Sequence, residues 1–358
     1  MICPDAFVLQ AQQVGQVLGL DVDSDALRPR SRGPVSPGSS WAPPGWLPVT
    51  LAEAEGQVII DWARFGRVAV DQSFYSDAVT TAICRPFNRV IRHATTLDAF
   101  ISAAPAQPAT ALAGLVFHMS RCGSTLVAQM LGALDATISL SEPGPLDAVV
   151  RYALARPDIP QERHVALMRA MVAALTRPRS GEQRCFLKLD SWHILALPLF
   201  RAAFPDVPWI YLFRDPTEVL VSHLRMRGYQ TVPDLMPGGL YGAIEDASSG
   251  PAMQCASILA RYHDAAIEAL ANRDGIAIDY AELPTAFERR IVPHFSLNLS
   301  DAEHARVAAR GARDAKFPDS HFVPDGKIKQ REAGAEVTAA ADRYLSACHA
   351  VLRDHAGR

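Results

Sequence analysis

Residues 118–126 read HMSRCGSTL and lie between an apolar run and a segment whose apolar residues recur at helical spacing. At such a strand-to-helix turn, the first amide groups of the helix have no partner within it and carry the positive end of its dipole. Gly123 lets the backbone approach an anion, Ser124 and Thr125 add hydroxyl donors, and Arg121 adds a guanidinium. The turn therefore predicts a phosphate or sulfate site, although a tight turn with a polar helix cap has the same local pattern.

A second candidate anion site lies in the segment FRDPTEVLVSHL, residues 213–224. Arg214 stands at the end of an apolar strand, and Ser222 follows about two turns along the next helix. A guanidinium and a hydroxyl placed in this way can bind one phosphate together. The same residues also make an ordinary helix start, with Asp215 as the cap and Pro216 in the first turn, and the two interpretations are compatible.

The elements that must position these residues alternate between strands and helices from Ala111 onward. We expect strands at 112–120, 185–190, 208–215 and 275–280, and helices at 125–134, 193–204, 216–227 and 253–272. A further strand ends near Glu142, in the segment ISLSEPGPLD. This alternation predicts an α/β fold with a parallel sheet flanked by helices, in which ligands sit at the carboxyl ends of the strands.

The first 110 residues have a different composition. The segment 28–48 is rich in Pro, Ser and Gly and predicts an exposed linker or meandering arm, and 49–104 predicts a small α+β unit. We therefore divide the chain into an N-terminal accessory region, 1–110, and a main domain, 111–358.

Bulk properties exclude several classes of function. The 358-residue chain has a formal net charge of -3, which argues against a nucleic-acid partner. Its six cysteines are scattered without metal-ligand spacing, so neither a zinc site nor a disulfide framework is expected. The sequence shows no secretory signal and no apolar run of about 20 residues, so we expect a cytoplasmic protein without a membrane partner; a homodimer stays open.

Taken together and in order, the two candidate sites resemble the motifs of sulfotransferases that use 3′-phosphoadenosine-5′-phosphosulfate (PAPS). SRCGSTL is similar to the family's 5′-phosphosulfate loop, and the spacing from Arg214 to Ser222 is similar to its 3′-phosphate motif. The resemblance covers roughly residues 111–330 and implies the P-loop-like fold of that family, with PAPS as donor, its product PAP, and no metal. The loop residues that it implies as donor ligands are Arg121, Cys122, Gly123, Ser124, Thr125 and Leu126.

Several positions depart from the family pattern. The loop has Arg121, and many bacterial and carbohydrate members also have arginine there, whereas cytosolic members usually have lysine. The family's lysine-x-histidine strand motif appears as Lys188 and Asp190, so the histidine base is replaced. The family's late glycine-rich motif, which closes over the donor nucleotide, is not intact here. Arg313 and Lys316 lie near its expected place and are candidates for donor binding. Trp192 is the candidate for stacking on adenine.

The resemblance also implies a general base. Carbohydrate and tyrosyl members use a glutamate from the region that holds Glu142 here, so Glu142 is our first candidate; an exposed turn carboxylate is the alternative. Asp190 is the second candidate. Lys188, in an apolar strand, is expected to face the leaving phosphate, because a buried ammonium needs an anionic partner. Of two histidines, we expect His118 to pack in its strand, and His193 to be either structural or functional.

Two alternatives remain at this point. A P-loop kinase would use Asp190 for magnesium, but the loop has Ser124 where the lysine of GxxxxGK[ST] would stand and His118 in place of its first glycine. A non-catalytic nucleotide-binding module would lack a carboxylate facing the acceptor. The acceptor, a hydroxyl or amine on a small molecule or carbohydrate, is not specified further by the sequence.

Overall fold

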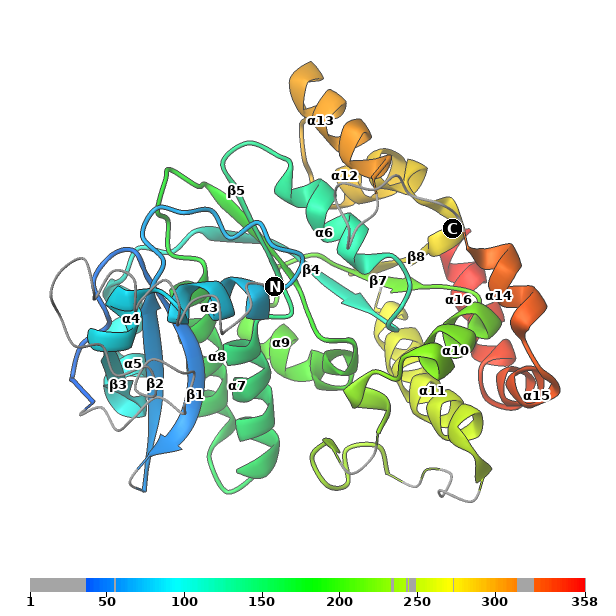
Figure 1. Cartoon of the computed structure of the whole chain (residues 1–358), viewed down its shortest axis with the longest axis horizontal. Coiled ribbons are helices and arrows are strands. Elements are labelled where there is room, and N and C mark those ends of the chain that lie inside the picture. The colour runs from blue at the N-terminus through cyan, green and yellow to red at the C-terminus, as the bar shows by residue number, and fades with distance from the viewer. Residues whose placement is uncertain are drawn as a thin grey trace, which may run out of the picture.

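The computed structural model describes residues 37–54, 56–232, 235–242, 244, 249–272, 274–313 and 325–357. These residues form two sheets, one parallel and one antiparallel, with helices around them (Figure 1). Both the parallel sheet and the small N-terminal α+β region were predicted from the sequence. No helix among these residues combines the length and apolar character needed to cross a bilayer.

The central sheet has five parallel strands in the order β5-β6-β4-β7-β8. The strands are β4 (Ala111–His118), β5 (Thr137–Ser141), β6 (Arg184–Lys188), β7 (Trp209–Phe213) and β8 (Gly275–Asp279). Their short apolar runs suit strands that are covered on both faces, and all five residues of β7 are buried. Because β4 lies between β6 and β7, the residues that follow these three strands meet at one edge of the sheet.

Helices cover the central sheet on both sides. In Figure 1, α6 (Ser124–Gly132) lies above the sheet with α13 (Asp301–Gly311) packed on it, whereas α9 (Leu197–Ala203) and α11 (Pro251–Leu270) lie below. The other helices of this part are α7 (Gly144–Ala155), α8 (Gln161–Leu175), α10 (Pro216–Arg225), α12 (Val292–His294), α14 (Gly326–Glu332), α15 (Ala335–Tyr344) and α16 (Ser346–Ala356). Short helical turns are η2 (Ser191–Ala196), η3 (Tyr229–Thr231), η6 (Tyr280–Glu282) and η7 (Phe287–Ile291).

The N-terminal region contains the antiparallel sheet. Its strands are β1 (Trp46–Ala54), β2 (Gln57–Arg64) and β3 (His93–Thr96), with α3 (Tyr75–Ile83), α4 (Pro86–Val90), α5 (Leu97–Ala103) and η1 (Ala104–Ala106) beside them. Strand β1 contacts α7 and α8 of the main part. The boundary at residue 110 stays a prediction.

Two expectations about these elements were wrong. The stretch up to Pro48 was expected to be exposed, as a linker or a meandering arm, but Trp41 is buried. Its ring stacks on Phe100 at 5.0 Å, and its indole N–H donates to the Phe100 carbonyl at 2.8 Å. Aromatic packing thus orders a proline-rich stretch, and the part of this stretch before residue 37 lies outside the described residues. The single helix expected at 193–204 is instead η2 followed by α9, because Pro198 has no N–H and suits the first turn of a new helix.

Candidate functional site

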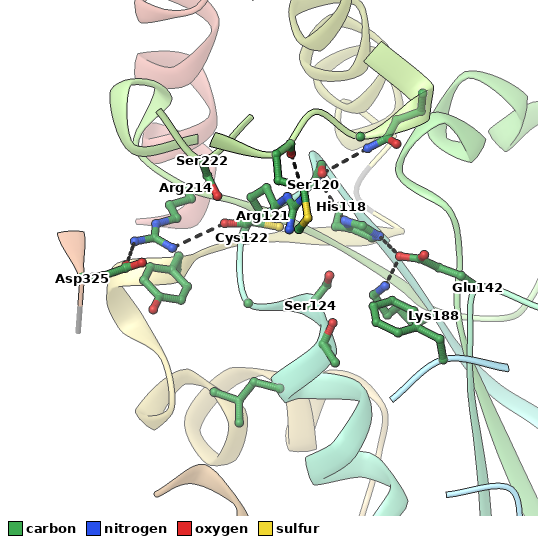
Figure 2. Close-up of a pocket in the computed structure, with 18 of the residues that line it drawn as sticks. His118, Ser120, Arg121, Cys122, Ser124, Glu142, Lys188, Arg214, Ser222 and Asp325 are labelled. Carbon is green, nitrogen blue, oxygen red and sulfur yellow. Dashed lines mark hydrogen bonds and ion pairs between the residues drawn. The ribbon is translucent and has the colours of Figure 1, made fainter. Parts of the chain in front are cut away.

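A cavity of about 540 Å³ opens where β4, β6 and β7 end. Figure 2 shows the two sides of this cavity: Glu142 and Lys188 lie at one end, Arg214 and Asp325 at the other, and the loop of residues 120–124 lies between them. The cavity thus brings together the two candidate anion sites, which are far apart in the sequence.

The loop between β4 and α6 has an unusual backbone. Ser120, Arg121 and Gly123 have φ angles of 87°, 54° and 80°, all in the left-handed region. Successive turns of this kind direct backbone N–H groups toward one point and form anion-binding concavities. Gly123 is the N-cap of α6 and has no side chain to cap the first turn, which leaves those amide groups for a ligand.

Gly123 is required at its position for two reasons. Its φ of +80° is one that side-chain-bearing residues rarely adopt, and an added Cβ would lie 2.8 Å from the ring of Tyr280. Tyr280 in turn lies against Arg214, whose guanidinium carbon is 4.0 Å from the ring centroid. The glycine therefore allows one aromatic ring to fill the space between the loop and the second anion site.

Side chains of the loop already have partners within the chain. Arg121 Nη2 donates to the carbonyl of Met226 at 2.9 Å, and the Gln230 amide donates to Ser120 Oγ at 3.2 Å. Both partners come from the segment that follows α10, which also lines the cavity. Cys122 Sγ contacts the Leu212 carbonyl in the core, and burial raises the pKa of this thiol to about 11. Because the Cys122 side chain is held in the core, it is the backbone of Cys122 that can contact a ligand in the cavity.

Glu142 and Lys188 form an ion pair at one end of the cavity. The Lys188 side chain is 1% exposed, and its ammonium lies 5.3 Å from the ring centroid of Phe74, which comes from the N-terminal region. Glu142 has a left-handed backbone, with φ of 49°, and its N–H donates to the Lys188 carbonyl at 2.7 Å. This turn directs the carboxylate to the cavity wall, so Glu142 is not the exposed turn residue of the alternative interpretation.

The pKa of Glu142 reflects this pairing. Burial acts to raise it, but the charge of Lys188 and the contact with His118 outweigh burial, so the pKa lies well below its usual value. A carboxylate with so low a pKa is a weak base while it keeps these partners.

His118 supports the carboxylate from the end of β4. Its Nδ1 accepts from the Ser120 amide at 3.0 Å, so the ring hydrogen is on Nε2, which donates to the Leu189 carbonyl at 2.9 Å and lies 3.5 Å from Glu142. Burial, followed by the charge of Lys188, lowers the pKa of His118, so the ring is neutral at pH 7. His118 therefore packs at its strand end, as expected, and also positions Glu142.

Arg214 lies at the other end of the cavity, 6% exposed. Its Nε donates to Glu218 at 2.6 Å and its Nη2 to Asp325 at 2.9 Å. Asp325 also pairs with Lys329 at 2.8 Å. Ser222 lies on the same wall of the cavity, so the arginine, the hydroxyl and a further lysine face one space.

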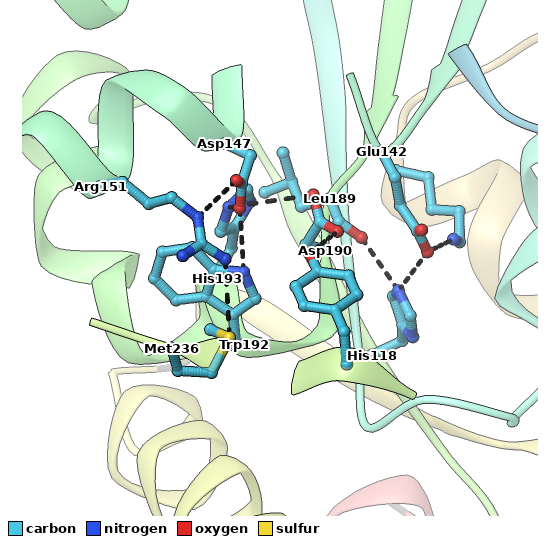
Figure 3. Close-up of polar contacts among 11 residues, drawn as sticks. His118, Glu142, Asp147, Arg151, Leu189, Asp190, Trp192, His193 and Met236 are labelled. Atoms are coloured by element: carbon cyan, nitrogen blue, oxygen red, sulfur yellow. Dashed lines mark hydrogen bonds and ion pairs between the residues drawn. The ribbon is translucent and has the colours of Figure 1, made fainter. Parts of the chain in front are cut away.

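Asp190 belongs to a neighbouring polar network (Figure 3). It accepts at 2.9 Å from the hydroxyl of Tyr229, which lines the cavity, whereas Asp190 itself lies outside the lining. Burial raises its pKa to about 6, and the nearby charge of Glu142 acts in the same direction. Asp190 therefore reaches the cavity through Tyr229.

His193 and Asp147 complete this network. His193 is fully buried, and its Nε2 lies 3.2 Å from Asp147, which accepts from Arg151 at 2.7 Å. Within the described part of the chain, Asp147, Asp190 and His193 are the group whose ligand atoms lie close enough together for a metal ion, all within 4.8 Å. Trp192 also donates to Asp147, at 3.0 Å, and is buried in the core rather than in the cavity wall.

The structure gathers most of the residues singled out from the sequence. The cavity is lined by Arg121, Cys122, Gly123, Ser124, Thr125, Leu126, Glu142, Lys188, Arg214, Ser222 and Arg313. Lys316 lies outside the described residues. The roles of these residues stay predictions.

Other cavity residues were missed by the sequence analysis: Phe74, Tyr229, Tyr280, Asp325 and Lys329. Tyr280 is the last residue of the strand expected at 275–280, so its place at the sheet edge gave a usable signal. Phe74 and Lys329 gave none, because they reach the cavity through packing between segments distant in sequence.

Comparison with known proteins gave distant likenesses. Neither a protein-family model nor a curated protein matches the chain. Solved structures to which it is similar include sulfotransferase STF1 from Mycobacterium tuberculosis, with 15% identity over 69% of this chain and 81% of that one, at a TM-score of 0.41. Mouse sulfotransferase SULT7A1, solved in complex with PAP, shows 14% identity over 72% and 93% of the two chains, at a TM-score of 0.39.

Proposed function

We propose that the protein is a sulfotransferase that moves a sulfuryl group from PAPS to a hydroxyl or amine of a small-molecule or carbohydrate acceptor. One observation carries this proposal: two separate anion-binding groups and a carboxylate line the same cavity. Two such groups in one cavity suit a nucleotide that carries phosphate at two positions. A nucleoside triphosphate has all its phosphates in one chain and makes no use of the second group.

We assign the loop of residues 120–125, together with the Glu142–Lys188 end of the cavity beside it, to the phosphosulfate of the donor; these two parts are called the loop end below. The first amides of α6, the hydroxyls of Ser124 and Thr125, and Arg121 are donors suited to its oxygens. Arg214 and Ser222 are assigned to the 3′-phosphate, and Arg313, which also lines the cavity, is a further candidate for donor binding. The loop of residues 226–230 packs against Arg121 and Ser120, so these side chains exchange internal partners for the donor.

Sulfuryl transfer requires in-line positioning and stabilisation of charge on the leaving phosphate. Lys188 suits the second task, because it is buried at the loop end and needs an anionic partner. Glu142 is the proposed base, since it lies in the cavity wall beside that ammonium. An anion that draws Lys188 away from Glu142 also removes the main cause of its low pKa, so donor binding raises the basicity of this carboxylate.

The acceptor is proposed to enter beside Glu142, where Phe74 and Tyr229 add aromatic surface. We place the reaction in the cytoplasm; the five cysteines among the described residues are free thiols, as in a reducing compartment.

Ligand-dependent melting tests the donor assignment. PAP should raise the melting temperature, because a ligand that binds the folded state stabilises it. ATP with magnesium should do so far less, and magnesium should not be needed for PAP. Equal stabilisation by ATP–magnesium and PAP would favour a kinase instead.

A further inference from the structure

Two buried cations share one carboxylate at the Arg214 end of the cavity. Asp325 Oδ1 lies 2.9 Å from Arg214 Nη2, and Asp325 Oδ2 lies 2.8 Å from Lys329 Nζ. The side chains of Arg214 and Lys329 are 7% and 6% exposed, whereas that of Asp325 is 40% exposed. The carboxylate therefore covers both cations from the open side, and all three residues line the cavity.

We infer that Arg214 and Lys329 together form the site for the donor's 3′-phosphate, and that the Asp325 carboxylate is a built-in competitor that this phosphate displaces. The inference rests on the function proposed above and adds two residues to it. A phosphate dianion on these two cations would lie close to the Asp325 carboxylate and compete with it for the N–H groups that now face it, and like charges at that range repel. Binding at this end is consequently an exchange of one anion for another.

The exchange needs only the side chain of Asp325 to move. Helix α14, which follows Asp325, is held against α10 by other contacts: Gln330 donates to Asp215 at 2.7 Å, and Arg225 Nε lies 3.0 Å from Glu332. Arg214 keeps its second carboxylate partner, Glu218, at 2.6 Å and its stacking on Tyr280. The cations thus stay in position when the Asp325 carboxylate leaves them.

This arrangement selects among nucleotides. A nucleotide with a 3′-phosphate replaces the carboxylate with a more highly charged anion and recovers both ion pairs. A nucleotide with phosphate at the 5′ position alone leaves Asp325 in place and gains nothing at this end. Competition with Asp325 therefore increases the difference in affinity between nucleotides with and without a 3′-phosphate, and it does so through charge rather than shape.

The affinities of PAP and adenosine-5′-phosphate, measured by titration calorimetry for wild type and Asp325→Asn, test the inference. Asparagine keeps the size of the side chain and removes its charge, so PAP should bind about tenfold more tightly, the scale of one charge-assisted contact. The affinity for adenosine-5′-phosphate should not change. Asp158→Asn, in an exposed pair with Arg156, changes the net charge equally and should leave both affinities unchanged.

A second variant separates the role of Lys329 from that of Asp325. In the Asp325→Asn background, Lys329→Met should weaken PAP binding about tenfold and leave adenosine-5′-phosphate unaffected. No loss in that background would show that Lys329 merely holds Asp325, and would overturn the two-cation site. PAP binding to Asp325→Asn that equals or falls below wild type would overturn the competitor role. Absence of PAP binding in wild type would instead refute the proposed function, and this inference with it.

Discussion

The two ends of the cavity are built from different parts of the chain. The loop end is made mainly by backbone: left-handed turns at Ser120, Arg121 and Gly123 and the first amides of α6. The other end is made by side chains, with Arg214 and Lys329 as cations and Asp325 as their partner. A backbone site depends on conformation and tolerates changes of side-chain charge, whereas a side-chain site depends on charge. Substitutions should therefore affect the two ends in different ways.

The largest effect should come from the carboxylate at the loop end. Glu142→Gln removes the proton acceptor, so turnover should fall about 10²–10⁴-fold, the usual scale for a lost general base. PAP affinity should not fall, because the Glu142 carboxylate does not help to hold a polyanion and competes with it for Lys188. Turnover is measured as sulfated product from PAPS, with an acceptor identified by mass-spectrometric screening of a cell extract.

Asp190→Asn is the matched control for this experiment. Since Asp190 reaches the cavity only through Tyr229, its amide variant should lose less activity than Glu142→Gln. A large loss at Asp190 with a small one at Glu142 would transfer the base to Asp190. Melting temperatures should be compared as well, because Glu142→Gln leaves the buried Lys188 without its carboxylate.

Removal of the cation at the other end should have the next largest effect. Arg214→Ala should weaken PAP binding about tenfold or more, since a charge-assisted contact contributes roughly 1.5–3 kcal/mol. The affinity for adenosine-5′-phosphate should fall far less. Similar losses for both nucleotides, measured by calorimetry, would show that Arg214 is structural. They would contradict the assignment of its end of the cavity to the 3′-phosphate.

At the loop end, a substitution that changes backbone conformation should affect both stability and binding. Gly123→Ala forces a Cβ into a left-handed position and against the ring of Tyr280, so the free energy of unfolding should fall by about 1–3 kcal/mol. Because Tyr280 also lies on Arg214, binding of PAP should weaken too. Chemical denaturation measures the first effect; an unchanged stability would mean that the loop relaxes without strain.

The smallest effect is expected at Tyr229, which lines the cavity and contacts Asp190. Tyr229→Phe removes a hydrogen bond donated to Asp190 and should cost about 0.5–1.5 kcal/mol of stability at pH 8. The pKa of Asp190 is raised to about 6, and loss of this donor raises it further, because the bond favours the charged form. The difference in unfolding free energy between wild type and Tyr229→Phe is therefore largest above that pKa, where Asp190 is charged. It should shrink as the pH falls toward 4.5 and Asp190 becomes protonated. A penalty that does not depend on pH would indicate lost packing alone.

The sequence predicted the parts of this molecule that depend on local pattern. Short apolar runs gave the strands of the central sheet, and the loop and Arg214 followed from where those runs end. Contacts between distant segments could not be predicted in this way. Trp41 packs on Phe100, and Lys329 shares Asp325 with Arg214, which lies more than a hundred positions away, so neither had a local signal. The low pKa of Glu142 likewise depends on Lys188, 46 positions along the chain.

Phe74, a residue of the N-terminal region, forms part of the cavity wall. Its ring faces the Lys188 ammonium, and the neighbouring Ser73 accepts a hydrogen bond from Gln129 of α6 at 3.1 Å. A fragment that began at residue 111 would keep both anion sites but would open the wall over Lys188 to water. Domain-swap and truncation experiments should therefore treat residues 37–110 as part of the unit that forms the cavity rather than as a separable region.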